Sequence, residues 1–91
     1  MARVLMIVQH AVGNYDAWRI EYENAQPIRD RHGVSDAVVL RSADDPNDVT
    51  GLHWFSSVDD AQRFAADPDL KEAMTKSGVV GPVRIEISVE A

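Results

Sequence analysis

The sequence predicts a single α+β domain whose elements follow the order strand, helix, strand, strand, helix, strand. Three observations predict it. Runs rich in Val, Ile and Leu lie near both ends of the chain, two more flank a turn, and two segments with helical spacing separate these strands. With 91 residues the chain has room for one domain, residues 1–91. We expect a four-stranded antiparallel sheet with the helices on one face.

The first part of the chain is predicted to form a strand and then a helix. Residues 3–10 are apolar at most positions, as in a strand buried on both faces. Asn14 is a favourable N-cap for the helix. The aromatic residues after it recur at helical spacing: Tyr15, Trp18 and Tyr22. Pro27 interrupts this pattern, so it either kinks the helix or opens a new turn, and Gly33 follows as the residue that ends the segment.

The middle of the chain is predicted to form a hairpin. Residues 34–42 and 49–55 have the composition of strands, and the sequence ADDPND between them is typical of a turn. A hairpin has one register, which decides which side chains share a face. The register that we expect has two pairs: Arg41 opposite Gly51, and Val39 opposite His53.

The last part of the chain is predicted to form two helical segments and a final strand. Ser57 and Asp60 resemble a capping box that opens a helix over residues 58–66. A second helical segment begins at Asp67, with Pro68 in its first position. The final strand alternates apolar and polar residues, so we expect it to be half-buried with a polar outer face. Its apolar positions are Val83, Ile85, Ile87 and Val89.

The composition indicates which partners to expect. Three strands are apolar on both sides, so a second copy of the same sheet is the simplest cover for the face without helices, and we expect a homodimer. The net charge of −6 disfavours nucleic acid and anionic membranes as partners. The apolar run Val4–Val8 is too short for a signal peptide or a membrane span, so we expect a cytoplasmic protein.

Three stretches of the sequence resemble a known family: QHAVGNYDAW, RSADDPNDV and LHWFSSVDDAQRFAADPDLKEAM. They are similar to the small actinobacterial-type members of the antibiotic biosynthesis monooxygenase-like group. The resemblance implies a ferredoxin-like fold that pairs into a dimeric α/β barrel. It implies no single chemistry, because the group contains cofactor-independent oxygenases of aromatic polyketides and quinols, haem-degrading enzymes and proteins without known activity.

The haem-degrading branch does not fit this sequence. Its members have an Asn on the first strand, a Trp on the second helix and a His ligand shortly after it. Here the first strand offers Gln9 and His10, the matching helix has Phe64, and residues 57–91 contain no His. The three histidines are also too far apart in sequence to preset a metal chelate. We therefore expect no cofactor and no metal.

One face of the predicted sheet has the character of a ligand pocket. If the strand at 49–55 runs antiparallel to the first strand, His53 falls near Met6, on a largely apolar face that also carries His10 and Arg41. An apolar wall with a few polar groups is typical of small-molecule sites. One histidine would take a phenolic proton and Arg41 would hold the resulting anion, so the candidate catalytic residues are His53, His10 and Arg41. The candidate substrate-binding residues are Trp18, Tyr22, Tyr15, Phe55 and Met6.

Each candidate also has a structural explanation. His53 could be a hydrogen-bonded core histidine, and Arg41 could pair with Asp44 or Asp45 in the turn. The aromatic residues could simply anchor the first helix. Two functions therefore stay open. The first is a cofactor-independent monooxygenase-like or cyclase-like enzyme that acts on a polyketide- or quinol-like aromatic molecule. The second is a non-catalytic homodimer that binds a small apolar ligand or has closed its cavity.

Overall fold

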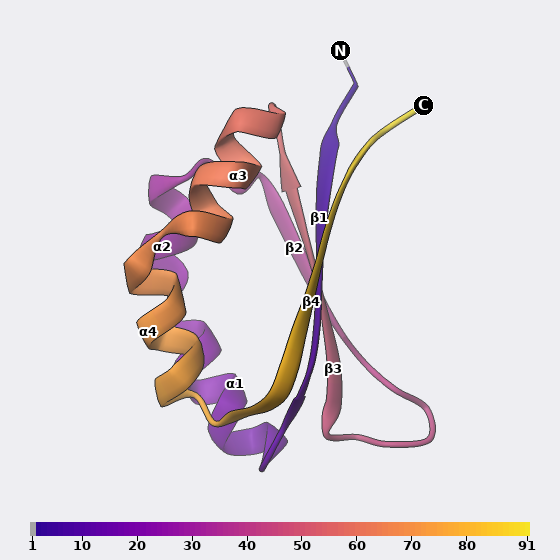
Figure 1. Ribbon diagram of the computed structural model, residues 1–91, viewed down its shortest axis with the longest axis vertical. Helices are drawn as coiled ribbons and strands as arrows, with labels where there is room; N and C mark the ends of the chain where they lie inside the picture. Colours follow the sequence, from indigo (N-terminus) through magenta and orange to yellow (C-terminus); the bar gives the residue numbers. More distant parts are fainter. Residues whose placement is uncertain (1) are drawn as a thin grey trace.

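The computed structural model describes residues 2–91 and shows an antiparallel sheet with helices on one of its faces (Figure 1). The strands lie in the order β2-β3-β1-β4. In chain order the elements are β1 (Val4–Val12), α1 (Tyr15–Asn24), α2 (Gln26–Arg31), β2 (Asp36–Arg41), β3 (Asp48–Phe55), α3 (Val58–Ala66), α4 (Pro68–Lys76) and β4 (Val79–Val89). The predicted α+β class and four-stranded antiparallel sheet are confirmed, and each predicted helical segment between strands consists of two helices.

The helix boundaries follow from local chemistry. The side chains of Asn14, Ser57 and Asp67 each accept a hydrogen bond from a backbone N–H in the first turn of α1, α3 and α4. Pro27 opens α2 instead of kinking α1. Gly33 ends that segment with a φ of 74°, a left-handed conformation that favours glycine. These predicted caps are confirmed.

The predicted hairpin register is wrong by two residues. Arg41 pairs with Val49 and Val39 pairs with Gly51. The reason is a tighter turn, in which the backbone N–H of Ser42 donates to the carbonyl of Asp48 at 2.9 Å. A shift of two residues preserves the alternation of faces. The predicted neighbours Met6 and His53 are directly paired between β1 and β3.

The core lies between the sheet and the helices, and its largest fully buried side chains are Phe55, Phe64, Met6 and Val49. The final strand differs from its prediction. It begins earlier, at Val79, and Ile85 and Val89 face the helix side through their pairing with β1 but are 42% and 57% exposed. The helices cover only part of this edge strand, so the expected half-buried strand is mostly exposed.

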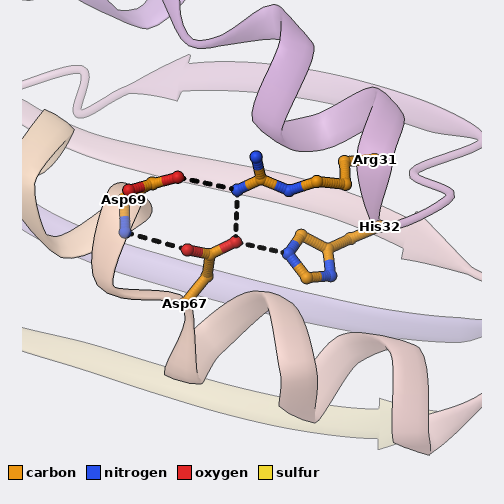
Figure 2. A network of polar contacts seen from close by, with 4 residues as sticks. All are labelled: Arg31, His32, Asp67 and Asp69. Atoms are coloured by element: carbon orange, nitrogen blue, oxygen red, sulfur yellow. Dashed lines mark hydrogen bonds and ion pairs between the residues drawn. The ribbon is translucent and has the colours of Figure 1, made fainter.

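A polar network ties α2 to the junction of α3 and α4 (Figure 2). The carboxylate of Asp67 accepts a hydrogen bond from Arg31 and pairs with His32, both at 2.6 Å. Arg31 also reaches Asp69 at 3.1 Å. Every charged group in this network therefore has a partner of opposite charge or a hydrogen-bond partner. Within residues 2–91, no helix is long and apolar enough to cross a membrane.

Candidate functional site

A cavity lies between the sheet and the helices. Its volume is about 60 Å³, and its surface is mainly apolar. The sheet contributes residues of β1 and β3, including Met6 and His53, and the helices contribute residues of α1, α2 and α4. The sequence predicted five of its wall residues by their type and position: Met6, His10, Trp18, Tyr22 and His53.

His53 is a polar residue of the cavity wall that is contributed by strand β3 of the sheet. It is 5% exposed, and its Nε2 lies 3.1 Å from the hydroxyl oxygen of Tyr22 on α1. The pKa of His53 is lowered to about 4, mainly by burial and to a smaller extent by the nearby Arg29 guanidinium. The pKa of the Tyr22 hydroxyl is raised by burial. Both groups are therefore neutral at pH 7, and His53 is a buried free base.

The backbone of β3 makes room for this imidazole. A Cβ atom added at Gly51 would lie 2.8 Å from Cε1 of His53, which is closer than real Cβ contacts. Gly51 sits two residues before His53, on the same face of the strand. A side chain at this position would therefore displace the ring from its hydrogen bond with Tyr22.

His10 lies on the same face of the sheet but at a distance from His53. It pairs with Val49, which is four residues before His53 on β3, so the two histidines are about 13 Å apart along the sheet. The His10 ring contacts the edge of Trp18, with 5.8 Å between the ring centroids. Burial lowers the pKa of His10 as well. The two histidines therefore lie at different positions along the cavity wall.

Aromatic rings form a continuous wall along α1. Trp18 stacks on Tyr22 with 4.9 Å between the ring centroids and an interplanar angle of 26°. His53 in turn contacts Phe64 of α3 at 5.6 Å. A flat aromatic ligand would find π-faces on this side of the cavity and aliphatic side chains of α4 on the other. The latter are Leu70, Ala73 and Met74.

Arg29 on α2 is a wall residue that the sequence analysis missed. It is 3% exposed, and its guanidinium carbon lies 3.8 Å from the centre of the Tyr22 ring. The helical spacing of Trp18, Tyr22 and Ala25 continues to Arg29, so this pattern could have identified it. Pro27 concealed the pattern, because it suggested a break in the helix between these residues.

Three predicted site residues do not line the cavity. Phe55 belongs to the core beside it, where it packs against Phe64. Tyr15 lies under the guanidinium of Arg41 at 3.8 Å. Arg41 itself is exposed and donates from Nε to the carbonyl of Pro46 at 2.9 Å, without any ion pair to Asp44 or Asp45. The cation in the cavity wall is therefore Arg29, not Arg41.

A second hollow adjoins the cavity. This groove has a volume of about 310 Å³ and runs between α1, α2 and α4. It shares Glu21, Ala25 and Ala73 with the cavity wall. Lys76 of α4 approaches Glu21 of α1 across it, at 3.9 Å. In the chain from residue 2 onward, no group of three or more His, Cys, Asp or Glu side chains is placed to hold a metal ion.

Solved structures with the same arrangement of elements are known. A Bordetella bronchiseptica protein, assigned provisionally as an antibiotic biosynthesis monooxygenase, superposes with a TM-score of 0.82 at 18% identity, over 97% of this chain and 96% of that one. The chain has the antibiotic biosynthesis monooxygenase fold. SnoaB, a cofactor-independent oxygenase from Streptomyces nogalater, superposes with a TM-score of 0.73 at 15% identity, over 100% of this chain and 93% of that one. Rv0793 from Mycobacterium tuberculosis superposes with a TM-score of 0.69 at 16% identity, over 94% of this chain and 92% of that one.

At these identities the likeness extends to the fold and not to the chemistry of the site. No protein-family model matches the sequence, and no curated protein matches it. The function must therefore be argued from the cavity of this chain.

Proposed function

We propose that the chain is a cofactor-independent oxygenase of a small aromatic molecule such as a quinol or a polyketide-derived phenol. The observation that supports this most directly is the neutral, buried His53, which is hydrogen-bonded to Tyr22 in a mainly apolar cavity. A neutral imidazole can accept a proton from an acidic ligand, and the surrounding rings would hold that ligand in a fixed orientation. The likeness in fold to SnoaB, which is described as a cofactor-independent oxygenase, supports this proposal.

The proposed chemistry begins with proton transfer to His53. Tyr22 fixes the orientation of the imidazole through its hydrogen bond, and the ligand loses a proton from an acidic O–H or C–H bond. The electron-rich anion then reduces O₂ and forms a C–O bond with it. For an anthrone, the ring CH₂ becomes C=O, one oxygen atom enters the product and the other leaves as water. The substrate itself supplies all four electrons.

The small size of the cavity favours a second candidate, a non-catalytic protein that binds only a small apolar ligand or whose cavity has closed. A volume of about 60 Å³ holds a few water molecules, whereas cavities that accept a benzene ring measure roughly 150 Å³. For the enzyme, the wall must therefore yield when the ligand binds. α4 is suited to this because none of its residues is fully buried, and the adjoining groove offers space for the rest of a larger substrate.

Oxygen uptake tests the proposal. We expect a panel of hydroquinones and anthrones to contain a substrate, and His53→Gln to lower kcat by about 10²–10⁴-fold. His32→Gln is the matched control, because His32 lies outside the cavity wall. The acid limb of kcat/KM should reflect the pKa of His53 near 4 in the free protein. Full activity in His53→Gln would remove His53 from the mechanism, and ligand binding without oxygen uptake would favour the binding protein.

We also propose that two copies assemble through the face of the sheet that carries no helices. Val38 and Leu40 of β2 are exposed and lie on that face, since they alternate with Val39, which faces the helices. Covering this area with a second sheet would remove apolar surface from water. Sedimentation should then give a particle of twice the 10.1 kDa chain mass, and a lone 10.1 kDa particle at micromolar concentration would contradict the dimer.

A further inference from the structure

We propose that the cavity binds an aromatic anion, and that Arg29 pairs with the charged oxygen of that ligand. This inference rests on the proposed function, since it takes the cavity to hold an aromatic ring. It adds the chemical class of the ligand, a phenolate or aromatic carboxylate, and a residue that recognises it.

Arg29 is a buried cation without a carboxylate in direct contact. Its Nη2 donates to the carbonyl of Tyr22 at 2.7 Å and to Oε1 of Gln26 at 3.1 Å, and both of these acceptors are neutral. No carboxylate of residues 2–91 lies within ion-pair distance of it. A cation in this position is costly unless an anion compensates it.

Other arginines of the chain form ion pairs with carboxylates. Arg19 approaches the same Tyr22 ring at 5.2 Å, but its side chain is 40% exposed and pairs with Glu23 at 2.7 Å. Arg31 pairs with two carboxylates. In the described part of the chain, Arg29 is the arginine that is both buried and without a carboxylate partner.

The end of α1 compensates Arg29 only in part. The carbonyl of Tyr22 belongs to the last turn of that helix, where the helix dipole places about half a negative charge. Glu23 and Asp30 attract the guanidinium without an ion pair, yet burial still lowers the pKa of Arg29, so the positive charge is only partly compensated. The guanidinium is also part of the cavity wall, so a ligand in the cavity could reach it.

Other polar groups of the wall leave this charge available. His53 and Tyr22 are neutral at pH 7, and Glu21 faces Lys76 rather than Arg29. An anion beside Arg29 would also offset the repulsion that the guanidinium exerts on protonated His53. Binding of the anion should therefore raise the proton affinity of His53, which makes it a stronger base when the ligand is present.

Two probes of nearly the same shape test the inference: 4-nitrophenol, which ionises, and 4-nitroanisole, which cannot. We expect the wild-type protein to bind the phenolate at least about tenfold more tightly than the anisole, as for a hydrogen bond to a charged group. Arg29→Gln should abolish this preference, because it removes the charge that distinguishes the phenolate from the anisole. Arg19→Gln is the matched control, because it removes the exposed, paired guanidinium on the same ring and should keep the preference.

The wild-type protein alone gives a second test that does not depend on the folding of a variant. Burial by itself raises the pKa of a bound phenol, whereas pairing with Arg29 lowers it, and the absorbance of nitrophenol reports the direction. A raised pKa, equal affinity for both probes, or a preference that survives in Arg29→Gln would overturn the role of Arg29 and leave an aromatic pocket in place. If neither probe binds, the proposed function fails together with this inference.

Discussion

Two polar clusters of the molecule contain the same kinds of cationic and titratable residues and differ in how these are paired. In the outer network, Arg31 and His32 share the carboxylate of Asp67 (Figure 2). In the cavity, Arg29 and His53 have no carboxylate, and Nδ1 of His53 has no hydrogen-bond partner in the described chain. The outer network is complete and holds helices together, whereas the cavity cluster lacks a negative charge.

Residue type alone therefore does not identify a site. A His and an Arg beside a carboxylate hold parts of the fold together, because each charge has a partner within the chain. The same pair in an apolar cavity lowers the stability of the free protein, which is typical of groups kept for a ligand.

The stability of the wild-type protein should fall between pH 6.5 and pH 4 because of His53. Its pKa is about 4 in the folded protein, against the ordinary histidine value of 6.5 that applies to the unfolded chain, so unfolding takes up a proton in this window. Relative to His53→Gln, the free energy of unfolding of the wild type should fall by about 3 kcal/mol across this range. Denaturant unfolding of both proteins at several pH values measures this difference. Parallel pH profiles for the two proteins would contradict the low pKa.

Gly51→Ala should destabilise the protein by about 1–3 kcal/mol, because the new Cβ would overlap Cε1 of His53 at 2.8 Å. It should also break the contact of His53 with Tyr22. Gly13→Ala is the matched control, since a Cβ there meets no atom within 4 Å. Thermal unfolding of both variants measures the difference, and similar losses in the two would show that His53 does not depend on the space at Gly51.

Asp67→Asn should lower the unfolding midpoint by several degrees at pH 7. The hydrogen bond from His32 and then that from Arg31 lower the pKa of this carboxylate. The stability that it contributes is therefore present above the ordinary pKa of an aspartate, near 4, and is lost as the pH falls below it. The difference between variant and wild type should shrink below about pH 4, a range distinct from that of His53. A constant difference down to about pH 2 would exclude this linkage.

Arg31→Gln should have the smallest effect, within a degree or two of the wild-type midpoint. Its side chain is 51% exposed, and exposed ion pairs contribute little to stability. His32 would still hold Asp67. A large loss in a thermal melt would mean that the guanidinium, rather than the imidazole, keeps the outer network together.

Much of the fold could be predicted from the sequence because alternation and capping are local signals. The predicted faces of the hairpin are correct although its register is wrong, since a shift of two residues keeps every side chain on its side. The exposure of Ile85 could not be predicted, because it depends on where the helices lie over the last strand.

The candidate site was only partly predictable for a similar reason. His53 and Tyr22 were both predicted as site residues, and the structure joins them by a hydrogen bond. Arg41 shares the face of the sheet but lies at its edge, where it contacts Pro46 and Tyr15 instead. Arg29 continues the helical spacing of Tyr22 and Ala25, but Pro27 suggested a break in the helix and concealed this pattern.

The most direct test is an NMR titration of the His53 imidazole with and without saturating 4-nitrobenzenesulfonate, an aromatic anion that stays ionised throughout the titration. We expect a pKa of about 4 in the free protein, set by burial and by the unpaired Arg29, and a clear rise when the anion is bound. An ordinary pKa near 6.5 in the free protein, or a value that the bound anion leaves unchanged, would contradict the view that this cavity is suited to a negative charge.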